Sequence, residues 1–181
     1  GSHTVIFEAN GGTGTMANQV ESTATALIAN AFTRTSYNFN GWNTAADGSG
    51  TSYTDGQTYS FASNMTLYAQ WALAPALSAS PTSLSFGSQC ISGTYGPNSF
   101  TLSGVALTNA NVTVASLSGF TFSTTSGGTY TSSLSLAQSG GTYSQEIFVR
   151  FSPVLAQSYN GNIAIGGGGA STINVAVSGS G

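Results

Sequence analysis

Apolar and polar residues alternate along most of the first 72 residues, and this period of two predicts half-buried β-strands. Strands are predicted over 4–10, 36–42, 58–63 and 65–72, with a weaker one over 19–27. Turn-forming clusters such as the GGTG after Asn10 separate them. The pattern therefore predicts a sheet of four or five strands.

A short helix is predicted over residues 28–36, IANAFTRTS, which do not alternate. One helix among four or five strands is typical of a small α+β domain. Trp42 does not share the parity of Tyr37 and Phe39 in the strand before it. Either a bulge at Asn40 and Gly41 returns the indole to the inner face, or the helix covers it from the other side; otherwise it is exposed.

The second segment, residues 77–181, is strand-like throughout and predicts an antiparallel β-sandwich. Alternating runs separated by turn clusters predict about eight strands, at 83–90, 99–107, 111–117, 120–124, 130–138, 146–153, 159–165 and 172–179.

The boundary between the two segments is predicted at residues 73–76. All four prolines lie after residue 74, and apolar alternation stops at Trp71 and resumes at Leu84. The Ala- and Pro-containing stretch between them is typical of a short, fairly stiff linker. Residues 1–3, GSH, resemble an expression-vector remnant, so the predicted domains are 4–72 and 77–181.

Charged residues make up only 4% of the chain, far below the level of about 25% in ordinary domains. The cations are Arg34 and Arg150, and there is no lysine, so no basic patch can attract nucleic acid or an anionic membrane surface. No apolar run is long enough for a membrane-spanning helix. The single cysteine, Cys90, excludes an intrachain disulfide, and its parity with Leu84 and Phe86 predicts a buried thiol without chemistry.

The run GWNTAADGSGTSY, residues 41–53, permits three interpretations. As a calcium loop it offers one carboxylate, Asp47, so any such site would be weak. As the rim of a sugar site it offers aromatic rings and polar side chains. As a turn between strands it has the expected Asp-Gly signal, which the pattern favours. The candidate ligand-binding residues are Trp42, Asn43, Asp47, Tyr53 and Tyr59.

The chain lacks most of the side-chain groups that catalysis usually requires. A nucleophile needs a base beside it, but there is no lysine, and the only histidine, His3, lies in the stretch that resembles a vector remnant. The closest acids in sequence, Asp47 and Asp55, both precede glycine in turn dipeptides. We therefore expect no catalytic residue and no cofactor.

A family resemblance appears in VIFEANGGTGTM, followed by FTRTSYNFNGWNTAADGSGTSYTDGQTYSFASNMTLYAQW. Residues 4–72 resemble the Listeria–Bacteroides repeat, or internalin-type B repeat, with Ser36 where that family usually has glycine. The resemblance implies a β-grasp-like fold in bacterial surface and secreted proteins, without catalytic residues. LSASPTSLSFG and IFVRFSPVLAQSYNGNI are similar, less specifically, to immunoglobulin-like modules of bacterial surface proteins.

We therefore expect an extracellular or cell-surface fragment that acts as a stalk and adhesion module, with a surface protein or glycan as partner. Its exposed strand edges lack lysine and so suit the addition of a partner strand. The fragment is expected to be monomeric. The alternative is a carbohydrate-binding accessory module of a larger extracellular enzyme.

Overall fold

The structure, a computed structural model, describes all 181 residues and contains strands but no helix. About 54% of the chain is strand, which confirms the mostly-β prediction. None of its elements is a helix with the length and apolarity needed to cross a bilayer. The chain divides into two compact units, unit 1 (Gly1–Ala74) and unit 2 (Pro75–Gly181), and each is described by itself.

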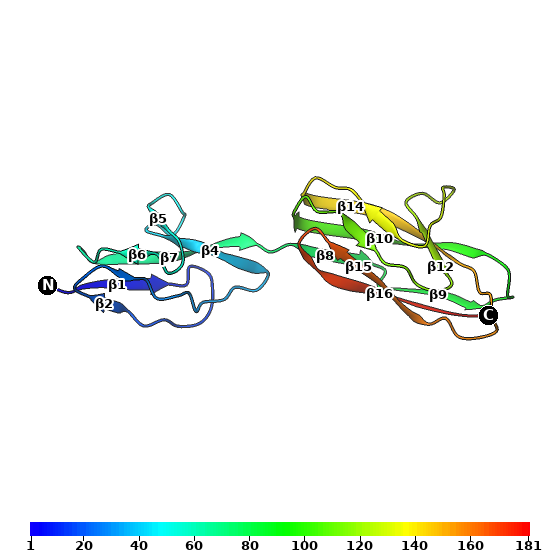
Figure 1. Cartoon of the computed structure of the whole chain (residues 1–181), viewed down its shortest axis with the longest axis horizontal. Helices are drawn as coiled ribbons and strands as arrows, with labels where there is room; N and C mark the ends of the chain where they lie inside the picture. The colour runs from blue at the N-terminus through cyan, green and yellow to red at the C-terminus, as the bar shows by residue number, and fades with distance from the viewer. The chain divides into compact units, whose positions relative to one another are not determined.

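Unit 1 is built on a five-stranded sheet in the order β2-β1-β7-β4-β5, beside a separate two-stranded pair, β3-β6. The strands β1 and β7 run parallel, and the other neighbours are antiparallel (Figure 1). Its strands are β1 (His3–Glu8), β2 (Gln19–Glu21), β3 (Thr25–Ala26), β4 (Tyr37–Asn43), β5 (Ser52–Tyr53), β6 (Thr58–Tyr59) and β7 (Met65–Leu73).

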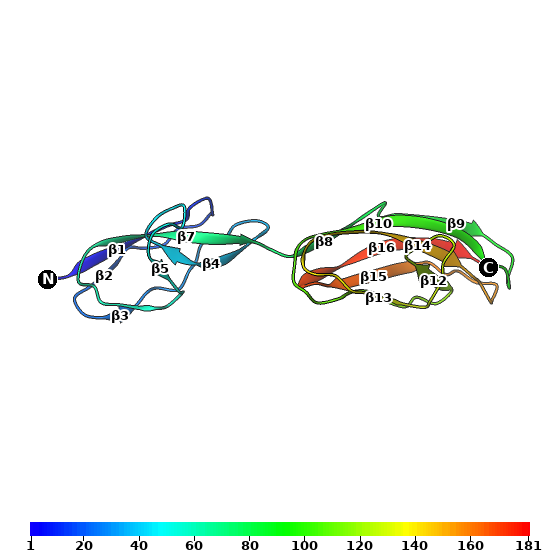
Figure 2. The ribbon, with the colours of Figure 1, turned by 90° about the horizontal axis from the view of Figure 1, so that it is seen from above.

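One face of this sheet packs against irregular chain and the β3-β6 pair. In Figure 2, β3 lies on one side of the layer that contains β1 and β7. Gln19 is buried between the layers, where its amide donates to Ala26 O (2.8 Å) and accepts from Ile28 N (2.9 Å). The core of unit 1 consists of Val5, Phe7, Leu27, Phe32, Trp42, Phe61, Leu67 and Ala69.

The predicted helix over residues 28–36 is wrong. Phe32 N donates to the Asn30 side chain (2.9 Å), which in turn donates to Phe32 O (3.0 Å). Local side-chain bonds of this kind compete with helical backbone bonds. Thr33 instead pairs with Thr13 through two backbone bonds of 2.7 and 3.0 Å, and Phe32 enters the core. Tertiary contacts therefore hold this segment in an extended form.

The strand β4 contains the bulge that sequence analysis gave as one of two ways to bury Trp42. Phe39 pairs with Trp71 and Trp42 pairs with Ala69, so Asn40 and Gly41 together face Gln70. Gly41 has a φ of 98°, which glycine adopts without strain. The extra residue reverses the parity of the strand and places Phe39 and Trp42 on the same face, with ring centroids 4.9 Å apart.

Ser36 occupies a left-handed turn position, with a φ of 65°, where related repeats usually have glycine. A side chain there costs about 1–2 kcal/mol, whereas glycine loses about 0.5–1 kcal/mol of extra chain entropy. Ser36→Gly is therefore expected to stabilise unit 1 by about 0.5–1 kcal/mol in urea unfolding. Thr35→Gly, one residue earlier, is the control and should destabilise it; equal effects of both changes would contradict this explanation.

Unit 2 consists of two sheets that enclose one core. The first has the order β12-β14-β10-β8 and the second β13-β11-β15-β16-β9. Phe100 and Ile147 from the first sheet and Val114 and Ile163 from the second belong to the same buried cluster. Its strands are β8 (Ala76–Ser80), β9 (Ser83–Ser88), β10 (Tyr95–Leu107), β11 (Val112–Val114), β12 (Phe120–Ser123), β13 (Leu134–Leu136), β14 (Gly141–Phe151), β15 (Gly161–Gly167) and β16 (Ala170–Ser180).

The prediction that Cys90 is buried is wrong, since its side chain is exposed. Leu84 and Phe86 do point into the core, as their parity predicts. Gly87 then has a φ of 64°, and β9 ends at Ser88, so the alternation does not continue to Cys90.

Candidate functional site

The loop between β4 and β5, residues 44–51, is organised around the fully buried side chain of Asn43. Its Oδ1 accepts from Ala45 N and Gly50 N, both at 2.9 Å. Its Nδ2 donates to Gly48 O (3.1 Å), Gly50 O (3.3 Å) and Ser52 Oγ (3.1 Å). One amide therefore satisfies several backbone groups of the loop and has no oxygen left for a ligand.

Asp47 lies at the exposed tip of this loop and binds its neighbour Ser49. The Ser49 hydroxyl donates to Asp47 Oδ1 at 2.6 Å and the Ser49 N–H donates to the same oxygen at 3.0 Å. These bonds, the hydroxyl's above all, hold the pKa of the Asp47 carboxyl below its usual value of 3.8. No group of three or more His, Cys, Asp or Glu residues converges anywhere in the structure. The loop geometry thus matches the turn interpretation.

Because the pKa of Asp47 is lowered, the hydrogen bonds of the loop tip should be lost only in acid below the usual pKa of a carboxyl group. The contribution of the carboxylate to the stability of the loop tip is fully present above the unfolded-state pKa near 3.8. It is lost as pH falls through the lower folded-state pKa. The NMR amide signal of Ser49 should therefore stay constant from neutral pH to about pH 5 and move only in stronger acid. Asp47→Asn should remove this change of the signal. A change whose midpoint lies above pH 3.8 would contradict the assignment.

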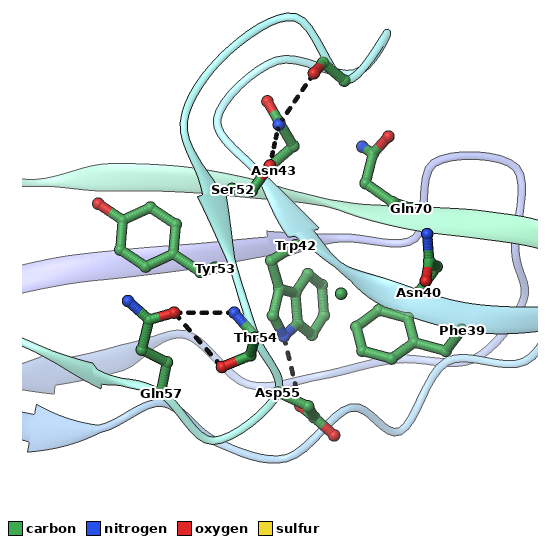
Figure 3. Close-up of a pocket in the computed structure, with 12 residues that line it drawn as sticks. Phe39, Asn40, Trp42, Asn43, Ser52, Tyr53, Thr54, Asp55, Gln57 and Gln70 are labelled. Atoms are coloured by element: carbon green, nitrogen blue, oxygen red, sulfur yellow. Dashed lines mark hydrogen bonds between the residues drawn. The ribbon is translucent and has the colours of Figure 1, made fainter.

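Trp42 forms the centre of an aromatic cluster and is only 1% exposed. Its ring lies 5.0 Å from that of Phe7, 6.1 Å from Phe32 and 4.9 Å from Phe39, measured between centroids. Its Nε1 donates to Asp55 Oδ1 at 3.4 Å, as Figure 3 shows. The indole is therefore a core side chain and offers no free face for stacking on a sugar.

A surface pocket of about 590 Å³ opens beside this cluster. Trp42, Asn43 and Tyr53 line it, whereas Asp47 and Tyr59 of the predicted ligand-binding set do not. The Tyr59 ring instead packs edge-on against Tyr53, 5.9 Å between centroids, and its hydroxyl donates to Ser63 O (3.0 Å). Sugar binding by these five residues remains a prediction. Fewer of their side chains are accessible than the sequence indicated.

Several pocket residues were missed by sequence reasoning. Phe39, Asn40, Asp55, Gln57 and Gln70 also line the pocket (Figure 3). Only Asp55 carried a signal, the Asp-Gly dipeptide, and that signal indicated a turn. Its Oδ1 also accepts from Asn30 N (2.9 Å), so its carboxylate connects residues 28–36, the covering segment, to Trp42.

The edge of β4 beside the pocket is open. Ala74 N donates to Ser36 O (2.9 Å), and the register pairs Asn38 with Ala72, so alternation directs the N–H and C=O of Phe39 away from β7. On that side β5 covers only Trp42 and Asn43. The chain then turns away, with Gln57 N donating to Thr54 O (3.1 Å). The outward backbone groups of Phe39 therefore have no strand beside them.

The residues of the repeat motif have structural roles around this site. Asn10 donates to Ala46 O (2.7 Å) and Ala69 O (2.8 Å), and so fixes the loop to β7. A Cβ on Gly12 would come within 2.6 Å of the Trp71 ring, and one on Gly50 would strike the Thr44 hydroxyl. At these motif positions the fold therefore requires a side-chain amide, at Asn10, or no side chain at all, at Gly12 and Gly50.

Residues 3–70 match the Listeria-Bacteroides repeat domain, whose members occur typically in extracellular or surface proteins of bacteria. A search of curated proteins gave no match to the chain. Unit 1 is therefore a Listeria-Bacteroides repeat domain.

Proposed function

We propose that the chain is a non-catalytic module that extends a bacterial surface protein and contributes to adhesion. The observation that carries the proposal is the open edge of β4, which lies beside a pocket within a repeat of surface proteins. Unpaired strand edges bind an extended partner segment through backbone hydrogen bonds, without a dedicated catalytic group. The backbone groups available here are the N–H donor and C=O acceptor of Phe39, and Asp55 offers a carboxylate to a basic side chain of the partner.

The pocket chemistry supports a binding role rather than a catalytic one. It is lined by amides and aromatic rings, and Asp55 is its only carboxylate. A glycosidase would need two carboxyl groups with separated pKa values in one cleft. Asp55 also accepts two hydrogen bonds that hold the fold together.

A bead assay tests the adhesive role. Beads coated with the chain should bind epithelial or bacterial cells more than beads coated with albumin. Asn40→Lys places a charge on the open edge and should reduce binding, because edge lysines prevent strand addition. Ser60→Lys, on an exposed residue outside the edge, is the charge-matched control. Robust polysaccharide or peptide hydrolysis by the same chain would overturn the proposal.

Carbohydrate binding is the second candidate, favoured by the aromatic and amide lining of the pocket. A glycan array should then show hits. The same glycans in solution should quench tryptophan fluorescence. Trp42→Ala is unsuitable for this test, because the ring belongs to the core. Asn40→Ala and Gln57→Ala should weaken such binding while Ser60→Ala leaves it unchanged, and an array without hits would count against this candidate.

A further inference from the structure

In both units a strand near the start of the unit pairs in parallel with its last strand. In unit 1, β1 pairs with β7 from Val5–Met65 to Glu8–Tyr68. In unit 2, β9 pairs with β16 from Ser83–Ala176 to Ser88–Ser180. The two units have different sheet orders, so this shared feature does not follow from a common topology.

We propose that these two parallel pairs are mechanical clamps, which let each unit carry tension between its ends. The inference rests on the stalk part of the proposed function. Tension on a stalk pulls β1 backwards from its start and β7 forwards from its end. Because the two strands are parallel neighbours, the force acts along them and loads all their ladder bonds together. In unit 2 the tension reaches β9 through β8, which is held to β10, and the same reasoning then applies to β9 and β16.

Side chains and flanking backbone groups lengthen both clamps. In unit 1, Thr4 N donates to Asn64 Oδ1 (2.9 Å), which adds a bond before the first ladder pair. In unit 2, Ala176 N donates to Thr82 O (2.9 Å) at one end of the ladder. Gln89 N donates to Ser180 O (2.9 Å) at the other end. Each added bond must break together with the rest when the strands slide.

The core of each unit also resists sliding. Val5 and Phe7 of β1 and Leu67 of β7 are buried, so displacement along the strands would pull these side chains past one another. In unit 2, Leu84 of β9 and Val177 of β16 form a register pair and are both buried. Forced unfolding is governed by the unfolding barrier, and it is this barrier that sliding of the packed strands would raise.

Single-molecule pulling in two directions tests the proposal on the full chain. End-to-end pulling slides the clamps. Handles on the exposed native Cys90 and on the C-terminus instead pull β9 and β16 apart from the end at which both strands finish. Bonds then break one pair at a time, so unit 2 should unfold at a force lower by at least about twofold at the same loading rate.

Unit 1 has an equivalent control. With Cys90→Ser and Ser63→Cys, handles on the N-terminus and the exposed residue 63 open the β1-β7 pair from its Val5–Met65 end. Unit 1 should again unfold at a lower force than in end-to-end pulling. Asn64→Ala should lower only the end-to-end force appreciably, whereas the exposed Ser60→Ala should change neither force.

Equal unfolding forces in the two directions would overturn the clamp, even if coated beads still adhere to cells. Conversely, a strong direction dependence without bead adhesion would uphold the clamp and remove the adhesive part of the proposed function. Urea unfolding of Asn64→Ala separates the two explanations of a lower force. A large loss of equilibrium stability, with the ratio of the two forces unchanged, would contradict a specific role for this bond in the clamp.

Discussion

Trp42→Ala is expected to destabilise unit 1 by about 3–5 kcal/mol, the largest effect of any substitution considered for this unit. The indole is 1% exposed and contacts rings from β1, from β4 and from the covering segment. Its removal leaves a cavity that these elements cannot close together. A domain of this size has about 4–11 kcal/mol of stability at typical values per residue, so the loss is a large fraction of the total.

Urea unfolding followed by the fluorescence of Trp71 measures this loss, since Trp71 remains in the variant. Trp42→Phe is the matched variant, because it keeps an aromatic ring but loses the bond to Asp55. It should cost clearly less than the alanine variant. Unit 2 has its own core and no tryptophan, so its transition is followed by circular dichroism; it serves as the internal reference and should be unchanged. A Trp42→Ala variant as stable as the parent would show that the indole is not part of the core.

Asn43→Ala is expected to destabilise unit 1 by about 2–4 kcal/mol. The change removes the acceptor of Ala45 N and Gly50 N and the donor to Gly48 O and Gly50 O. Buried polar groups that lose their partner cost more than the bond itself contributes. The loop next to the pocket should lose its fixed conformation as well.

Hydrogen exchange of the Gly50 amide and urea unfolding measure these two effects. Thr44→Val is the control in the same loop, because Thr44 Oγ1 accepts only one backbone bond, from Thr51 N (2.9 Å). It should cost about 1 kcal/mol. Equal losses for the two variants would mean that Asn43 has no special role in the loop. A rapidly exchanging Gly50 amide in the parent protein would lead to the same conclusion.

The contrast between Trp42 and Asn43 shows how far the sequence predicts this site. The sequence places both residues in one turn-containing motif. In the structure Trp42 belongs to the aromatic core, and Asn43, at the end of β4, is the buried side chain that bonds to the loop. The bulge decides this outcome, because one extra residue at Asn40–Gly41 reverses the face on which Trp42 lies. The Asn-Gly dipeptide permitted the bulge, but only pairing with β7 could require it.

Other differences have local causes that the pattern of apolar residues does not contain. The Asn30 side chain bonds to the backbone of Phe32, two residues away, and so keeps residues 28–36 from forming a helix. A left-handed glycine, Gly87, ends the alternation that predicted a buried Cys90. Asp55 became a pocket residue because the chain folds back beneath Trp42.

The sequence by itself determined the mostly-β class, most strand positions and the repeat family of unit 1. These features depend on alternation and on short motifs, which are local properties of the chain. The tertiary structure alone decided the burial of Trp42, the open edge of β4 and the parallel pairing of β1 with β7 and of β9 with β16. Such pairings join residues distant in the chain and depend on register and shared cores, which no local pattern specifies.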